Sequence, residues 1–140
     1  MSAHDSPQYG IGDASFQAAG GADGVHNLVS DFYRHMDSEN FAKRIRDMHP
    51  EDLASSIDRL YCFLSSWLGG PRLYQERYGQ INIPAVHFPF QINEDDSMAW
   101  LSCMRLAIEE QNYEPEFAQY LLEQLQLPAE RILMYGKVAR

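Results

Sequence analysis

The most constraining feature of this sequence is the helical spacing of its apolar residues. After Gly21 they recur every three or four positions, at Val25, Leu28, Val29, Phe32, Tyr33 and Met36. This spacing predicts an amphipathic helix with one buried face. The strict alternation of apolar and polar residues that is typical of a half-buried strand nowhere extends beyond a few positions. The sequence therefore predicts an all-α fold.

Glycine and proline residues mark the ends of the other helices in the first half. The glycine pair at 20–21 separates a short helix over 14–19 from the first long helix and lets the two cross closely. A short helical turn is expected around 39–46. Pro50, with two acidic residues behind it, is typical of a helix start, and the Gly-Gly-Pro sequence at 69–71 ends that second long helix.

The second half begins with a long irregular stretch. Residues 71–89 show no clear period, and a connection of that length usually serves a site. Asn93, followed by three acidic residues, predicts the cap of a third long helix. Pro115 predicts the start of a fourth, which Pro128 is expected to kink or split before it ends near Gly136.

The length of 140 residues fits one domain with a single core. Residues 1–13 are polar and lack the basic and apolar regions of a signal peptide, so they predict a flexible polar leader before a domain over 14–140. Cys62 and Cys103 stand far apart and without metal-ligand spacing. They predict two buried, reduced thiols.

The charge balance disfavours two classes of partner. Twenty Asp and Glu residues against eleven Lys and Arg residues give a net charge of −9, which repels phosphate backbones and anionic lipid. No apolar run approaches the roughly 20 residues that cross a bilayer. We therefore expect no nucleic-acid partner and no membrane partner, and the cytoplasm is the expected compartment.

The five histidines are the main candidates for chemistry. His4 lies in the leader, and His26 and His35 lie beside the apolar stripe of the first long helix, so we expect all three to be solvent-exposed. His87 stands in an apolar sequence, where a buried ring must place both of its nitrogens. Taken alone, such a residue is more often a core histidine bonded to a backbone carbonyl than a metal ligand. His49 directly precedes a predicted helix start.

Six short motifs follow one another along the chain. They are Gly20-Gly21, Asp31-Phe32-Tyr33, Met48-His49-Pro50-Glu51-Asp52-Leu53, Trp67-Leu68-Gly69-Gly70-Pro71-Arg72-Leu73-Tyr74, His87-Phe88-Pro89-Phe90 with Ile92, and Ala99-Trp100-Leu101-Ser102-Cys103-Met104. In order and approximate spacing they resemble the group II branch of the truncated haemoglobins, over roughly residues 16 to 110. The Gly-Gly-Pro sequence alone would be weak evidence for this family, whereas the combination of motifs is specific to it.

The resemblance implies a truncated globin fold, a two-over-two helical sandwich that encloses haem b (iron protoporphyrin IX). In the family, the irregular stretch carries the proximal iron ligand, and the matching residue here is His87. The resemblance implies that its Nε2 binds the iron, while its other ring nitrogen donates to a backbone carbonyl and fixes the ring.

On the opposite side of the haem, the resemblance places a distal set of residues around the bound gas. The Tyr33 hydroxyl and the Trp100 indole N–H would donate to the ligand and slow its release. Ser56 and Leu60, four positions apart, share one helix face. His49 replaces the commoner Phe or Tyr, and it could donate to the ligand, hold a water or bind the iron itself. Without haem, Tyr33, Leu60 and Trp100 would be ordinary core residues and Ser56 a solvated one.

Further residues are candidates for the haem wall and for the propionates. Group II chains often carry arginines where this chain has Pro84 and Val86, so those salt bridges are missing here. The remaining candidates near the propionates are Tyr74, Arg72 and Arg77. Walls of the macrocycle are expected at Phe63, Leu64, Leu68, Phe90 and Met104, each of which is otherwise ordinary core.

The implied function is binding of dioxygen, or of NO or CO, with slow release. Redox detoxification of NO or peroxide at the iron would need an electron donor, which the sequence does not identify. The sequence also leaves enzymatic activity and oligomeric state open. The alternative is a globin-fold sensing or interaction module that has lost its haem or uses it only as a switch. The missing arginines favour that alternative, and the joint presence of Tyr33, His87 and Trp100 weighs against it.

Overall fold

The computed structural model describes residues 8–79 and 92–139, and side chains over 8–79 and 92–134. Every regular element in these ranges is a helix, which confirms the all-α prediction. No helix in the described part is long and apolar enough to cross a membrane. The elements are α1 (Ala14–Ala18), α2 (Gly21–Ser38), the 3-10 turn η2 (Asn40–Ala42), α3 (Lys43–Asp47), α4 (Ala54–Trp67), α5 (Leu73–Tyr78), α7 (Glu94–Glu109) and α8 (Pro115–Ala139).

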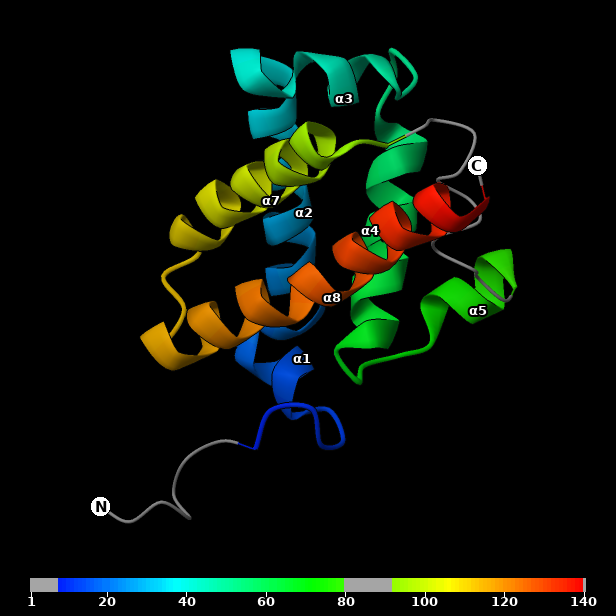
Figure 1. Ribbon diagram of the computed structural model, residues 1–140. Helices are drawn as coiled ribbons and strands as arrows, with labels where there is room; N and C mark the ends of the chain where they lie inside the picture. The colour runs from blue at the N-terminus through cyan, green and yellow to red at the C-terminus, as the bar shows by residue number, and fades with distance from the viewer. Residues whose placement is uncertain (1–7, 80–91, 140) are drawn as a thin grey trace.

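The long helices form two crossed pairs. Helix α2 packs against α4, and α7 packs against α8. Figure 1 shows α7 and α8, in yellow to red, crossing in front of α2 and α4, in blue and green. Contacts between α2 and α7 join the two pairs. This arrangement confirms the predicted two-over-two sandwich.

The predicted apolar stripe of α2 forms the centre of the core. All six of its residues, from Val25 to Met36, are buried. Side chains from α7 and α8 meet this stripe, among them Met104, Phe117 and Leu121, which are at most 1% exposed. Burying a side chain of this size stabilises the fold by about 1.5–3 kcal/mol. The core therefore holds the two helix pairs together.

Glycines at the start of α2 separate it from α1, as predicted. Gly20 has a φ of +93°, a left-handed backbone that an L side chain rarely adopts. One turn later, a Cβ on Gly24 would lie only 1.9 Å from the Ala19 carbonyl oxygen. Glycine at both positions therefore lets α1 cross close to the start of α2.

The structure corrects the predicted start of α4. This helix begins at Ala54 rather than near Pro50. The guanidinium of Arg46 donates to the Pro50 and Glu51 carbonyl oxygens, at 3.0 and 2.9 Å, and so holds this segment in an open bend. The Asp52 carboxylate then accepts from the Ala54 N–H at 2.9 Å, which marks the actual first turn.

The structure also corrects the predicted end of α8. The helix is not split at Pro128 and continues to Ala139, beyond Gly136. Pro128 removes one N–H donor from the helix, but its neighbours Leu125 and Ala129 are buried against the core. Packing on both sides of the proline therefore keeps the helix continuous.

Both cysteines are buried free thiols, as predicted. Burial raises the pKa of Cys103 to about 11, and burial also raises that of Cys62. The two thiols therefore stay protonated at neutral pH.

Of the predicted leader, residues 8–13 are described. Tyr9 packs its ring against Phe117 and Tyr120 of α8, with centroid separations of 5.2 and 5.0 Å. The boundary at residue 13 stays a prediction.

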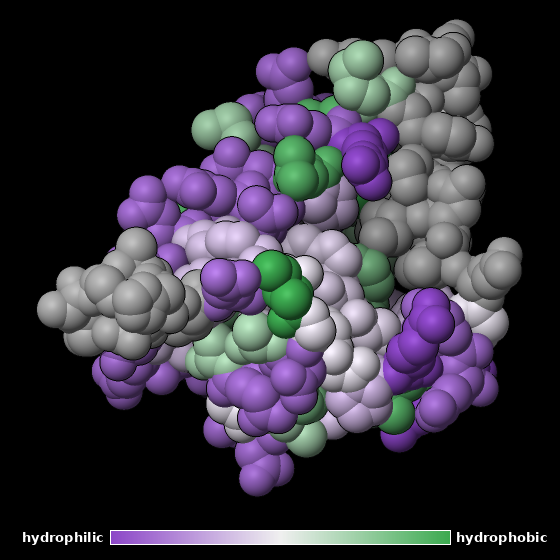
Figure 2. Space-filling model, turned by 90° about the horizontal axis from the view of Figure 1, so that it is seen from below, coloured by the Kyte–Doolittle hydropathy of each residue, from purple (hydrophilic) through white to green (hydrophobic). Residues whose placement is uncertain are grey.

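Figure 2 shows the molecule from below. The described surface on this side is mostly hydrophilic, with small separate hydrophobic areas.

Candidate functional site

A cavity of about 480 Å³ is lined by residues from both helix pairs. It brings together all five residues predicted for the distal set: Tyr33 from α2, His49 from the segment after α3, Ser56 and Leu60 from α4, and Trp100 from α7. These residues are up to 67 positions apart in the sequence, so only the helical sandwich places them around one space.

Most of the cavity wall is apolar. Phe63, predicted for the macrocycle wall, and Tyr74, predicted near the propionates, contribute to it from α4 and α5. Size and lining match those of cofactor sites, which enclose about 300–1,000 Å³ with mainly hydrophobic walls and a few placed polar groups. The remaining apolar wall is formed by Ile45, Met48, Pro50, Ile92, Leu125, Pro128, Ala129 and Ile132.

Tyr33 places a desolvated hydroxyl group in the cavity wall. Its side chain is buried on α2, and burial raises the pKa of its hydroxyl well above the ordinary tyrosine value. The hydroxyl therefore remains a protonated donor throughout the physiological range. The Tyr33 ring meets the rings of Phe32 and His49 edge-on, and Phe32 in turn contacts Trp100 at 5.0 Å between centroids.

The orientation of His49 is set by the backbone of α3. Its Nδ1 lies 2.8 Å from the Ile45 carbonyl oxygen. Since a carbonyl oxygen only accepts hydrogen bonds, Nδ1 carries the hydrogen and donates. In the neutral ring, Nε2 then carries the lone pair and acts as an acceptor. The sequence left three roles open for His49: donor to the ligand, holder of a water, or iron ligand. The first of these would require a protonated ring, because Nε2 of the neutral ring carries no hydrogen.

Arg59 was not singled out from the sequence, and it is the one Lys or Arg among the described residues that line the cavity. Its guanidinium carbon lies 4.4 Å from the centre of the Tyr78 ring, a cation–π contact that steadies the side chain. Arg59 follows Ser56 by three positions, so the helical spacing of α4 could have indicated it.

The two arginines predicted near the propionates do not line the cavity. Arg72 is exposed. Arg77 donates to the Asp58 carboxylate at 2.6 Å, and the same carboxylate accepts from the Tyr78 hydroxyl. Both hydrogen bonds lower the pKa of Asp58, and the one from Tyr78 has the larger effect.

Three of the predicted wall residues lie elsewhere. Leu64, Leu68 and Met104 are buried in the main core, outside the cavity lining. Phe90 and the predicted iron ligand His87 fall outside the described residues, as do Pro84 and Val86.

Helix α8 supplies a wall that the sequence analysis missed. Leu125, Pro128, Ala129 and Ile132 all line the cavity. Their spacing is the i, i+3, i+4, i+7 pattern of a helix face. The signal was present, but it could not be distinguished from the pattern of an ordinary core-facing helix.

One expectation about the histidines is wrong. His26 is exposed, as predicted, but His35 is only 14% exposed, and its Nε2 bonds to Glu110 at the end of α7. Glu110 also accepts from Arg34 at 2.6 Å. Glu110 lies 75 positions after His35, so the spacing around His35 gave no sign of this partner.

The family and two related proteins are consistent with this geometry. The family model of bacterial-like globins matches residues 14–133. The group 2 truncated hemoglobin YjbI of Bacillus subtilis is 35% identical over 109 residues, which cover 78% of this chain and 80% of that protein. The crystal structure of the group II truncated hemoglobin from Bacillus anthracis superposes with a TM-score of 0.80 at 30% identity, covering 91% of this chain and 92% of the other.

A third similar structure is described as a truncated oxygen-avid haemoglobin from Bacillus subtilis. It superposes with a TM-score of 0.77 at 33% identity, covering 85% of this chain and 98% of that chain. The likeness therefore extends over nearly the whole helical sandwich.

Proposed function

Because the chain belongs to the bacterial-like globin family and to its group II truncated haemoglobins, a family of haem-based gas-binding proteins, we propose that it binds dioxygen at a haem b and releases it slowly. NO and CO would bind at the same place. The oxygen avidity described for the Bacillus subtilis structure supports the choice of dioxygen.

The cavity fits a haem by its chemistry. Its wall is largely apolar, as a porphyrin face requires, and polar side chains such as Tyr33, His49 and Arg59 interrupt it. The haem, when bound, supplies the iron that takes up the diatomic ligand. We propose His87 as the proximal ligand on the strength of the family motif. Phe63 would pack against the macrocycle, Phe90 is proposed with it from the sequence, and Tyr74 would lie near a propionate.

The observation that carries the proposal is the pair of donors in the distal cavity. Tyr33 presents a desolvated, protonated hydroxyl, and Trp100 contributes an indole N–H from the opposite helix pair. A hydrogen bond to an acceptor that gains negative charge on binding is worth about 1.5–3 kcal/mol. Two such donors would slow release by orders of magnitude.

His49 would act as an acceptor beside Tyr33. With Nδ1 donating to the Ile45 carbonyl, the neutral ring presents Nε2 as an acceptor. We assign it the task of holding a water or a neighbouring hydroxyl in place. Iron binding by Nε2 is the competing role, because an Nδ1 that donates to a backbone carbonyl is also typical of an iron-ligating histidine.

Arg59 would pair with a haem propionate. It is the cation of the described cavity lining, whereas Arg77 is engaged with Asp58 and Arg72 lies outside that lining. A propionate carboxylate beside Arg59 would receive a charge-assisted hydrogen bond from its guanidinium. This role would compensate for the arginines missing at Pro84 and Val86.

Redox detoxification of NO or peroxide is a secondary proposal. A protein electron donor would meet a surface with a net charge of −9, so it would approach through a basic face. The sensing or interaction module remains the competing function, and its haem-free form would give a colourless protein with no iron.

The decisive test is the dioxygen dissociation rate of the ferrous, haem-loaded chain. We expect Tyr33→Phe and Trp100→Phe each to speed release by about tenfold or more. Release from the unaltered chain at the rate of an unassisted haem, unchanged by both substitutions, would refute the hydrogen-bonding account. A ferric spectrum that is the same in His49→Ala supports the role given to His49, whereas loss of low-spin bands in that variant would identify it as an iron ligand.

A further inference from the structure

Two hollows lie on either side of one methionine. The first is the cavity described above, and the second is an outer depression on η2, α3 and the residue after it, formed by Asn40, Phe41, Lys43, Arg44, Asp47 and Met48. Met48 lines both of them. Its half-buried side chain therefore forms part of the wall between the solvent side and the interior.

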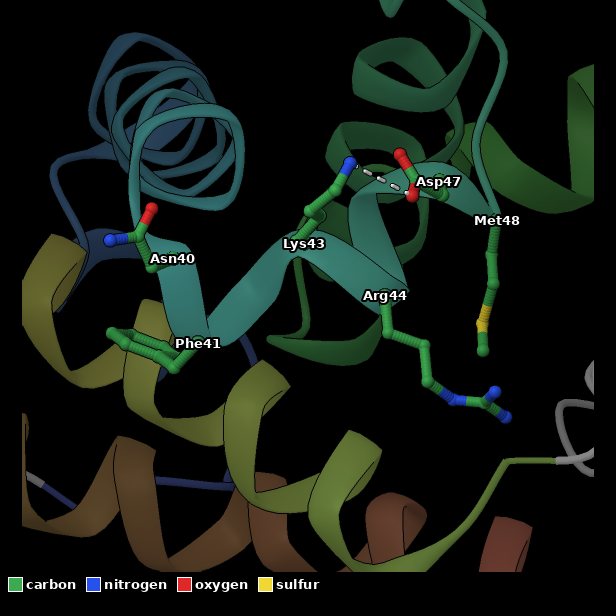
Figure 3. Close-up of a pocket in the computed structure, with 6 residues that line it drawn as sticks. All are labelled: Asn40, Phe41, Lys43, Arg44, Asp47 and Met48. Atoms are coloured by element: carbon green, nitrogen blue, oxygen red, sulfur yellow. Dashed lines mark hydrogen bonds and ion pairs between the residues drawn. The ribbon is translucent and has the colours of Figure 1, made fainter.

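An ion pair crosses the same wall. Arg44 lines the outer depression, and its Nε donates to both carboxylate oxygens of Asp96, at 2.9 and 3.1 Å. Asp96 lines the inner cavity from α7 and is only 3% exposed. In Figure 3, Arg44 and Met48 extend toward the first turn of α7, while Lys43 and Asp47 pair with each other away from it.

The two components of the wall differ in mobility. Displacing Arg44 would leave the charge of Asp96 buried without its cation, and Asp96 is also held by the Asn93 backbone N–H at 3.0 Å. Methionine is unbranched, with a flexible side chain that changes rotamer on short timescales. The ion pair is therefore the fixed edge of the wall, and Met48 is its movable part.

The inner side of this wall adjoins the distal set. Met48 is followed directly by His49, and Ile45, whose carbonyl orients His49, lines the same part of the cavity. A neutral diatomic molecule that passes Met48 would enter the cavity that Tyr33 and His49 line. Such a ligand sheds little hydration, so an apolar, flexible side chain is a small barrier to it.

We propose that the wall between α3 and α7 is an access route for diatomic ligands, with Met48 as its gate and the Arg44–Asp96 pair as its fixed edge. This inference rests on the proposed haem-based gas binding. A gate changes the height of a barrier and leaves the bound and free states unchanged. It therefore alters association and dissociation by the same factor, whereas the donors Tyr33 and Trp100 alter affinity.

The test is CO binding to the ferrous, haem-loaded full chain after flash photolysis. We expect Met48→Trp to slow CO association by about fivefold or more and CO dissociation by the same factor, since a bulkier side chain must move further to admit the ligand; a fivefold change corresponds to a barrier higher by about 1 kcal/mol. Met48→Ala is expected to speed both rates. The control is Met98→Trp on α7, because Met98 is 65% exposed and lines neither hollow. It should leave both rates unchanged.

CO association at the unaltered rate in both Met48 variants would overturn the proposal, as would a change in CO affinity that accounts for the whole effect. A second measurement needs no haem: quenching of Trp100 fluorescence by dissolved dioxygen in the haem-free full chain, with Trp67→Phe as the common background. Met48→Ala should raise the quenching constant by about twofold, and an unchanged constant counts against the route. Failure of the unaltered chain to take up hemin would refute the proposed function, and the quenching result would still decide the route.

Discussion

Asn93 and Asp96 cap each other at the start of α7. The Asp96 N–H donates to Asn93 Oδ1 at 2.8 Å, and the Asn93 N–H donates to Asp96 Oδ2 at 3.0 Å. The same Asp96 carboxylate binds Arg44 of α3. The Asp96 side chain therefore both completes the cap at the start of α7 and ties this helix to α3 at the wall of the cavity.

This double role predicts unequal losses of stability. Asn93→Ala removes only the cap and should lower the free energy of unfolding by about 1 kcal/mol. Asp96→Ala should cost about 2 kcal/mol or more, because it also leaves Arg44 without this carboxylate. Urea denaturation measures both values, and the exposed neighbour Asp95→Ala is the control. Equal losses in the two variants would show that the ion pair adds nothing to the cap.

A second prediction concerns acid stability. The Tyr78 hydroxyl and the Arg77 guanidinium bond to Asp58 and lower its pKa. A carboxyl whose pKa is lower in the folded state stabilises the fold above its unfolded value, near 4, and loses that contribution as the pH falls through the folded value. The difference in unfolding free energy between the unaltered chain and Asp58→Asn should therefore be full at pH 6 and should shrink below about pH 4.

The partners of Asp58 can be separated in the same measurement. The Tyr78 hydrogen bond is the largest single cause of the lowered pKa, and Arg77 acts both through a hydrogen bond and through its charge, so Tyr78→Phe and Arg77→Met should each reduce the acid dependence. A difference between the unaltered chain and Asp58→Asn that stays constant from pH 6 to pH 2.5 would contradict the assignment of this carboxyl as a source of acid sensitivity.

The parts of the fold that the sequence predicted are those set by local contacts. The stripe of α2 and the cap at Asn93 depend on residues within one or two helical turns of each other, so spacing alone indicates them. The start of α4 could not be read in this way, because the Arg46 guanidinium holds the Pro50 and Glu51 carbonyls in a bend that no helix-start pattern reveals.

The same distinction applies to the candidate site. The motifs indicated the distal set, and the structure brings those five residues around one cavity. Arg59 escaped notice because a charged residue on an amphipathic helix is ordinarily read as a solvent-facing one. The partnership of His35 with Glu110 joins residues 75 positions apart, so only the packing of α2 on α7 reveals it.

A third prediction tests the proposed role of Arg59. Arg59→Met keeps much of the side-chain volume but removes the charge, and transfer of hemin from the variant to an excess of a haem-free acceptor globin should be about tenfold faster. Arg72→Met is the matched control, since Arg72 is exposed and does not line the cavity. Hemin loss that is unchanged by Arg59→Met and faster in Arg72→Met would transfer the propionate role to Arg72.

The last prediction concerns Pro128, which lies inside α8 and lines the cavity. Pro128→Ala restores an N–H that can bond to the Gln124 carbonyl, and a proline inside a helix costs about 3 kcal/mol relative to alanine. The gain is reduced because the variant also gives the unfolded chain more freedom, worth about 0.4–1 kcal/mol, and because it loses a wall contact. We expect a net rise of about 1–2 kcal/mol in the free energy of unfolding by urea. Leu127→Ala, at an exposed neighbouring position, should change it little. A lower stability in Pro128→Ala would mean that the proline ring contributes more to the cavity wall than its missing hydrogen bond costs the helix.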